Sequence, residues 1–150
     1  MPSQHIPTIL DDALGFNIYR TALLFRNELM HALAEYDLTP EQWQVMQTLW
    51  SADKGLNQNE VAHLTLKDKH TVSRMLTRLE RDGWISRRPD PTDARAFRIE
   101  PTAQAQSLRD EVPAKLLQHF ATILGALDQE ERGELLLLLK KLRRRLGDDC

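Results

Sequence analysis

Hydrogen-bonding and cationic side chains recur at helical spacing between residues 67 and 78. They are Lys67, Lys69, His70, Thr71, Ser73, Arg74, Thr77 and Arg78. An α-helix fits the major groove of DNA, where its N-terminal residues reach base edges and arginine can donate two hydrogen bonds to guanine. Two groups of contacts are expected: to bases from Lys69, His70, Ser73 and Arg74, and to phosphates from Thr71, Arg78 and Lys67. An ordinary amphipathic surface helix would show the same pattern, so this segment alone leaves both interpretations open.

Three arginines, Arg87, Arg88 and Arg95, surround a Pro-rich segment that follows this helix pattern. If the segment is the tip of a hairpin, an arginine on it can enter a narrow minor groove, where the potential is most negative. Asp93 lies two residues before Arg95, and a carboxylate there can hold an arginine by a charge-assisted hydrogen bond. Such a bond would stiffen the tip before DNA is bound.

The cationic residues are concentrated in this part of the chain. The formal net charge is −2, yet residues 67–98 hold nine Lys and Arg against five Asp and Glu. The rest of the chain holds 11 Lys and Arg against 17 Asp and Glu. A basic segment on an acidic chain is typical of a localised phosphate-binding surface, although solvated helices also carry runs of charge.

Arrangements that could support catalysis are missing from the sequence. It has no Gly-x-Ser-x-Gly, no phosphate-binding glycine loop and no His-Glu-x-x-His. The five histidines are scattered, and the one cysteine, Cys150, can build neither a zinc site nor an internal disulfide. We therefore expect no enzymatic activity, no cofactor and no metal.

Several helices are predicted before the basic segment. Asp11 or Asp12 can begin a long helix to Tyr36, because its apolar residues are spaced by alternating threes and fours. Thr39 and Pro40 begin the next helix, with Val45, Met46, Leu49 and Trp50 on its apolar face, and Lys54-Gly55 ends it. Asn57 to Glu60 form a capping box for a short helix.

The basic segment itself is expected to be the second helix of a helix-turn-helix. Asp68 caps it, its buried face carries Val72, Met75, Leu76 and Leu79, and Gly83 ends it. The pattern then changes to strands over residues 84–88 and 96–99, joined by a turn at Pro89 to Asp93, which gives a wing. Asp90 and Asp93 are both placed on the exposed tip.

The C-terminal third predicts two more helices. One begins at Pro101, has a kink at Pro113 and ends at Gly125. Asp128 to Glu131 form a capping box for the other, which is rich in leucine and ends in lysines and arginines that suit a helix C-terminus. The fold class is mainly α with a small β-hairpin wing, a winged helix-turn-helix with N- and C-terminal dimerisation helices.

Residues 64–101 resemble the multiple-antibiotic-resistance regulator (MarR) family. The resemblance is carried by TVSR at residues 71–74, LERDGWI at 79–85 and RRPDPTDAR at 87–95. It implies that Arg95 reaches the minor groove and that Asp93 orients a neighbouring arginine such as Arg87 or Arg88. It also implies palindromic double-stranded DNA, a small phenolic or lipophilic effector, and a homodimer held by residues 11–36 and 101–147 around a DNA-binding domain at 38–100.

Dimerisation is also expected without the family. The first helix and the leucine-rich last helix carry more apolar surface than a small winged helix can cover. Two recognition helices spaced by about one turn of DNA would read a palindrome. The alternative is that the flanking helices cover each other within one chain.

An effector site is the least constrained expectation. The residues that could line it are His31, Tyr36, Trp43, Met46 and Trp50. Aromatic and methionine side chains suit an apolar ligand, but they are more often part of a plain core. The resemblance to the MarR family implies that a peroxide-sensing cysteine would lie near the first helix. Residues 1–36 contain no cysteine, so sensing by cysteine is not expected.

These observations predict a cytoplasmic, homodimeric, DNA-binding repressor released by a small molecule. No apolar run approaches the length of a membrane span, and residues 1–10 lack the pattern of a signal peptide. The alternative function is a winged-helix protein-interaction module that does not bind DNA, which need not keep a basic wing.

Overall fold

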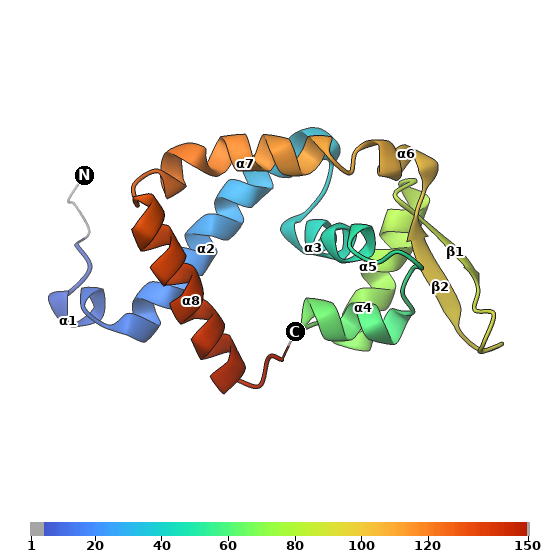
Figure 1. The fold of residues 1–150 in the computed structure, drawn as a ribbon, viewed down its shortest axis with the longest axis horizontal. Helices are drawn as coiled ribbons and strands as arrows, with labels where there is room; N and C mark the ends of the chain where they lie inside the picture. Colours follow the sequence, from blue (N-terminus) through green and yellow to red (C-terminus); the bar gives the residue numbers. More distant parts are fainter. Residues whose placement is uncertain (1–4, 150) are drawn as a thin grey trace. The chain divides into compact units, whose positions relative to one another are not determined.

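The computed structural model describes residues 5–149, and Figure 1 labels its helices and strands. The chain forms two compact units that divide inside a helix, between Trp43 and Gln44. Cys150 and residues 1–4 lie outside the described residues.

The first unit contains α1 (Thr8–Asp11), α2 (Leu14–Leu33), the 3-10 helix η1 (Ala34–Tyr36) and the start of α3 (Pro40–Trp50). The prediction that Asp11 or Asp12 begins the long helix is wrong. A short helix already begins after Pro7 and includes Asp11, and Ala13 is extended at φ −81° and ψ 122°, so the long helix begins at Leu14. Arg26 and Glu41 form a two-point ion pair, at 2.8 and 3.1 Å, that ties α2 to the start of α3.

The start of α3 agrees with the prediction, but its end does not. The Thr39 hydroxyl accepts the N–H of Gln42 at 3.1 Å, and the Gln42 side chain accepts the N–H of Thr39 at 3.0 Å. This reciprocal capping fixes the helix start. The helix ends at Trp50, before the expected Lys54-Gly55, and Gly55 instead makes a separate turn with φ +71°.

The second unit contains the helix-turn-helix, formed by α4 (Gln58–Thr65) and α5 (Lys69–Arg81). The predicted capping box is present, since Asn57 Oδ1 accepts the N–H of Glu60 and Glu60 Oε2 accepts the N–H of Asn57, both at 2.8 Å. Val72, Leu76 and Leu79 are fully buried, so the apolar face of α5 packs into the core as its spacing predicts.

The wing is an antiparallel hairpin of β1 (Ile85–Pro89) and β2 (Phe97–Pro101), in which Ile85 is paired with Pro101. In Figure 1 it projects away from α4 and α5. Leu56 forms a further bridge to Ile99, with N···O distances of 3.1 and 2.8 Å, so β2 lies between β1 and the segment before α4. The predicted strands are confirmed to within one or two residues at each end.

The helix expected to begin at Pro101 does not exist as predicted. Pro101 ends β2, Thr102 caps the short helix α6 (Ala103–Ser107), and α7 (Glu111–Leu124) follows after a break. Pro113 is the third residue of α7, where its missing N–H is tolerated, but a continuous helix would bring its ring against the carbonyl of Arg109. A break before Pro113 replaces the predicted kink.

The last helix, α8 (Gln129–Arg145), has the predicted capping box between Asp128 and Glu131. The fold class, mainly α with a two-stranded hairpin, is therefore confirmed. Among residues 5–149, no helix has the length and apolar character needed to cross a membrane.

Candidate nucleic-acid interface

The exposed side of α5 begins at its N-terminal cap. Asp68 Oδ1 accepts the N–H of Thr71 at 2.8 Å, and Asp68 Oδ2 accepts the Thr71 hydroxyl at 2.7 Å. These two hydrogen bonds hold the pKa of the Asp68 carboxyl below its usual range, and the bond from the Thr71 hydroxyl has the larger effect. The hydroxyl of Thr71 thus stabilises the helix start, which competes with its predicted phosphate contact.

The predicted base contacts lie together on one side of α5. Lys69, His70 and Arg74 are exposed, and Ser73 is half-buried between them. Arg78 is exposed one turn further on, and the Thr77 hydroxyl donates to the Ser73 carbonyl at 2.9 Å. Because the opposite side of α5 is fixed in the core, this surface is held rigid for a partner.

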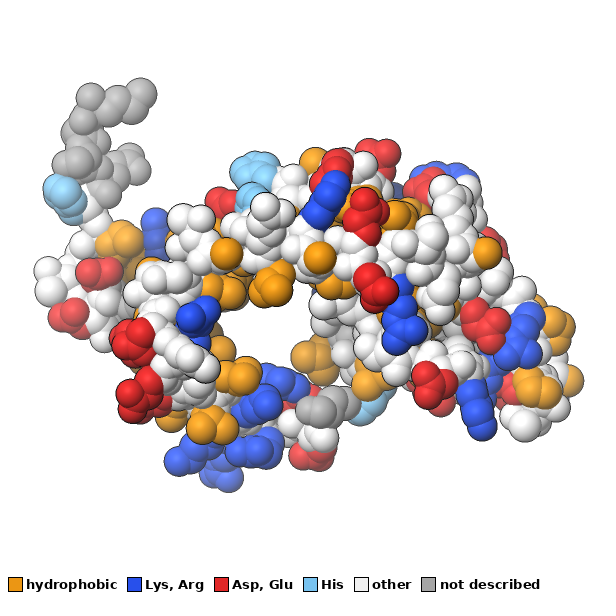
Figure 2. All heavy atoms as spheres, turned by 45° about the horizontal axis from the view of Figure 1, so that its top comes forward, with side chains coloured by type: hydrophobic (Ala, Val, Ile, Leu, Met, Phe, Trp, Pro, Cys, Tyr) orange, Lys and Arg blue, Asp and Glu red, His pale blue; other side chains and the backbone are white. Residues whose placement is uncertain are grey.

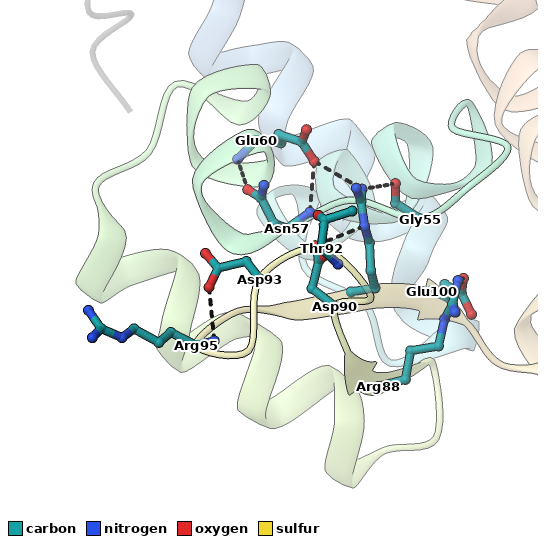
Figure 3. Close-up of polar contacts among 10 residues, drawn as sticks. Gly55, Asn57, Glu60, Arg88, Asp90, Thr92, Asp93, Arg95 and Glu100 are labelled. Atoms are coloured by element: carbon teal, nitrogen blue, oxygen red, sulfur yellow. Dashed lines mark hydrogen bonds and ion pairs between the residues drawn. The ribbon is translucent and has the colours of Figure 1, made fainter.

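The tip of the wing is shaped by Asp93, but not in the predicted way. The Asp93 carboxylate accepts the backbone N–H of Arg95 at 2.9 Å, as Figure 3 shows. The expectation that it orients Arg87 or Arg88 is wrong, because both arginines have other acidic partners. The guanidinium of Arg95 points away from the other side chains drawn in the figure, and Arg95 is exposed.

The two arginines of β1 have different partners. Arg88 Nη2 lies 2.7 Å from Glu100 Oε1, across the hairpin. Arg87 reaches α5, with its Nε 3.6 Å from Glu80 Oε2 and its Nη2 3.4 Å from the Thr77 hydroxyl. The wing is therefore linked directly to the helix that carries the predicted base contacts.

The nine cations of residues 67–98 divide into two groups. Four have acidic partners within the chain: Arg81, Arg87, Arg88 and Arg98. Among the described residues, no ion pair is formed by the other five: Lys67, Lys69, Arg74, Arg78 and Arg95. The unpaired cations are those at the start and on the outer side of α5 and at the wing tip, so the net positive charge is left where a polyanion could reach it.

Sequence reasoning missed the buried acid of the wing. Asp90 was expected on the exposed tip, but its side chain is only 4% exposed and lies 3.1 Å from Arg98 Nε. The N–H and the hydroxyl of Thr92 both bond to Asp90 Oδ1, at 2.8 and 2.7 Å. These bonds, with the charge of Arg98, lower the pKa of the Asp90 carboxyl. Asp side chains commonly accept the backbone N–H two residues on, a signal that predicts the turn at Asp90 but not its burial.

The residues predicted to line an effector site differ in their surroundings. His31 is exposed on α2, Tyr36 is half-buried in η1, and Met46 is fully buried in α3. Trp43 is nearly buried near the start of α3. Trp50 borders a hollow of about 310 Å³ whose other walls include Glu100, Gln106 and Arg109.

The described residues offer no cluster of three or more His, Cys, Asp or Glu side chains that could hold a metal ion.

The combination of a basic helix-turn-helix and a basic wing also occurs in known proteins. The sequence profile of the MarR family matches residues 36–96, which run from η1 to the wing tip. This segment is similar to the MarR family. The resemblance expected from the sequence is thereby confirmed, and the MarR family is one of transcriptional regulators.

Solved MarR-like structures extend the similarity to most of the chain. The repressor CouR bound to a 23-mer DNA duplex is 26% identical with a TM-score of 0.85, covering 93% of this chain and 99% of CouR. A probable transcriptional regulator from Pseudomonas aeruginosa is 26% identical with a TM-score of 0.80, covering 89% and 98%. A cysteine mutant of E. coli MarR complexed with operator DNA is 25% identical with a TM-score of 0.79, covering 86% and 92%. CouR from Rhodococcus jostii RHA1 has also been solved with p-coumaroyl-CoA.

Proposed function

We propose that this protein is a DNA-binding transcriptional repressor of the MarR type. Two copies place α5 in successive major grooves of a palindromic operator, and Arg95 of each wing enters the adjacent minor groove. The observation that carries the proposal is the position of the unpaired cations. Lys69, Arg74 and Arg78 on α5 and Arg95 on the wing face outward without acidic partners among the described residues. CouR and MarR, similar in fold over most of the chain, are known in complex with DNA.

The pairing of two chains is supported by apolar surface on α8. Leucines at positions 135–139 are 40–67% exposed in the single chain, and Leu142 is 42% exposed. Figure 2 shows orange hydrophobic spheres beside a group of Lys and Arg near the end of this helix. A second copy would remove such a surface from water. Residues 11–36 and 101–147 are proposed as the dimerisation regions around a DNA-binding domain at 38–100.

The proposed repressor acts in the cytoplasm, has no enzymatic activity, and is released from DNA by a small phenolic or lipophilic molecule. CouR with bound p-coumaroyl-CoA is a precedent for such a ligand in a protein of similar fold. A ligand that favours one spacing of the two α5 helices would change the affinity for a fixed half-site separation. His31, Tyr36, Trp43, Met46 and Trp50 are the proposed effector residues.

The experiment is a DNA-binding titration with the purified protein and the DNA upstream of its own gene. We expect binding that weakens steeply with salt, because phosphate contacts release counterions. Arg74→Ala should weaken binding and change the preferred sequence, since Arg74 lies among the predicted base contacts. Wild-type protein that binds neither this DNA nor any duplex selected from a random library would reject the function.

The same titration distinguishes a DNA-binding repressor from the alternative, a protein-interaction module. Such a module has no need for the unpaired cations, so Arg78→Ala would leave its behaviour unchanged. A repressor with Arg78 at a phosphate should lose about one unit of salt slope, with its sequence preference retained. Analytical ultracentrifugation of the wild type should give twice the mass of one chain.

A further inference from the structure

One face of the hairpin carries four charged side chains in a row. Arg88 and Arg98 are direct cross-strand partners in the register of β1 and β2. Like charges opposite each other destabilise a strand pair unless they are compensated. Each arginine has a diagonal acid, Glu100 at 2.7 Å from Arg88 and Asp90 at 3.1 Å from Arg98. The row Glu100, Arg88, Arg98, Asp90 is called the charge ladder below.

The two ion pairs of the charge ladder differ in their contact with water. The side chains of Arg88 and Glu100 are 54% and 33% exposed, whereas those of Arg98 and Asp90 are 25% and 4% exposed. An exposed ion pair contributes little, because water screens it. A buried carboxylate that loses its partner is left as an uncompensated charge. The Asp90–Arg98 pair is therefore the one on which local structure depends.

Arg98 also contacts groups outside the hairpin. Its Nη1 donates to the Gly55 carbonyl at 3.2 Å and lies 3.6 Å from Glu60 Oε2, the oxygen that caps α4 through the N–H of Asn57. Figure 3 shows Gly55, Asn57 and Glu60 beside Asp90. The charge ladder thus ends in an arginine that is shared between the wing and the start of the helix-turn-helix.

We propose that Asp90 and Arg98 are positioning residues of the DNA-binding surface. By tying the base of the wing tip to residues 55–60, they hold Arg95 at a fixed place relative to α5, so that major-groove and minor-groove contacts are made in one register. Neither residue needs to touch DNA. The inference rests on the proposed DNA-binding function and assigns to it two residues that act through others.

The decisive variant is Asp90→Asn. An asparagine can still accept the N–H and hydroxyl of Thr92, so the turn at the tip is kept while the ion pair with Arg98 is lost. The variant also removes a negative charge near the DNA, which by long-range electrostatics alone should tighten binding. A positioning role predicts the opposite sign, a loss of about tenfold in affinity.

The probes are two duplexes. The first is selected by the wild-type protein from a random library, and the second has the base pairs beneath the wings changed from A·T to G·C. The wild type should prefer the first duplex, because a narrow A·T minor groove attracts arginine. Asp90→Asn should bind both with similar affinity. The proposal is overturned if this variant keeps the wild-type affinity and flank preference.

Glu100→Gln is the matched control. It makes the same change of charge in the same charge ladder. Glu100 lies against Gly55, a contact that the glutamine side chain keeps, but its ion pair is with Arg88 and not with Arg98. It should keep the flank preference and bind at least as tightly as the wild type. An equal loss of preference in Glu100→Gln would mean that any loss of a negative charge from the charge ladder has this effect, which rejects a specific role of the Asp90–Arg98 pair.

Arg98→Lys is a second variant, which tests the same proposal if Asp90→Asn does not fold properly. Lysine keeps the charge, but a single ammonium cannot meet Asp90, Gly55 and Glu60 as a guanidinium does. It should lose the flank preference while its thermal unfolding stays cooperative. An unchanged preference in Arg98→Lys contradicts the proposal. Failure of the wild type to select any duplex would instead overturn the proposed function.

Discussion

The Asp93 carboxylate accepts the backbone N–H of Arg95 at 2.9 Å, so this acid fixes the path of the chain and leaves the arginine side chain exposed. The carbonyl of Asp93 accepts the N–H of Ala96 at 3.1 Å, which closes the same turn. Asp93 therefore shapes the turn at the wing tip, and Arg95 is the residue of this pair that can contact DNA.

Removing the Arg95 side chain should lower the affinity for DNA more than removing the Asp93 carboxylate that shapes the turn. Arg95→Ala is expected to weaken binding to a selected duplex by about tenfold, because the minor-groove cation is lost. Asp93→Ala should weaken it less, since Arg95 is retained on a looser turn. Fluorescence anisotropy at constant salt measures both. Equal affinities for Arg95→Ala and the wild type would contradict a contact by this residue.

Gly55 occupies a position that no other residue should tolerate. Its φ is +71°, and an added Cβ would lie 2.8 Å from Glu100 Cγ and 3.0 Å from the Ile99 carbonyl oxygen. Gly55→Ala should lower the free energy of unfolding by more than about 1 kcal/mol, measured by urea denaturation. Gly133→Ala is the control: a Cβ there meets nothing within 4 Å, and alanine should stabilise α8 by up to about 1 kcal/mol. A neutral Gly55→Ala would show that residues 55 and 100 can separate.

Leu66 ends α4 in a left-handed conformation, with φ 55° and ψ 39°, and is 74% exposed. A branched side chain is strained there and buries little in return. Leu66→Gly should therefore raise the free energy of unfolding by about 1 kcal/mol. Leu64→Gly, inside the same helix, should lower it by at least about 1 kcal/mol. Urea denaturation of both variants checks the pair, and a destabilised Leu66→Gly would be the contrary result.

The cap of α5 should make stability sensitive to acid. The pKa of Asp68 is lowered in the folded chain by the hydroxyl and then the N–H of Thr71. A lowered folded pKa adds stability above the unfolded value of about 4, and this is lost as pH falls through the folded value. Asp68→Asn can still cap but does not titrate. The stability gap between the wild type and this variant should stay constant from pH 7 to about pH 5 and narrow as the pH falls below about 4, and a gap that stays constant in acid would refute the assignment.

Local signals predicted most of the elements correctly. The caps at Thr39, Asn57, Asp68 and Asp128 were all visible in the sequence, because each is a hydrogen bond between residues three apart. The errors arose where two local signals competed. Asp11 and Asp12 are good caps, but Pro7 begins a helix before them. Pro101 suits a helix start, yet β2 uses it to complete its pairing with Ile85.

The sequence by itself determined the kind of surface this protein presents, because helical periodicity fixes which side of α5 is apolar and which is basic. It also placed Arg95 at the tip of a hairpin. Only the tertiary structure decided which arginines form ion pairs within the chain and which remain open to a partner. Ion pairs such as Arg98 with Asp90, and the contact of Arg98 with Gly55, join residues whose separation along the chain carries no periodic signal. They depend on the strand register and on the bridge from Leu56 to Ile99, which form when the chain folds.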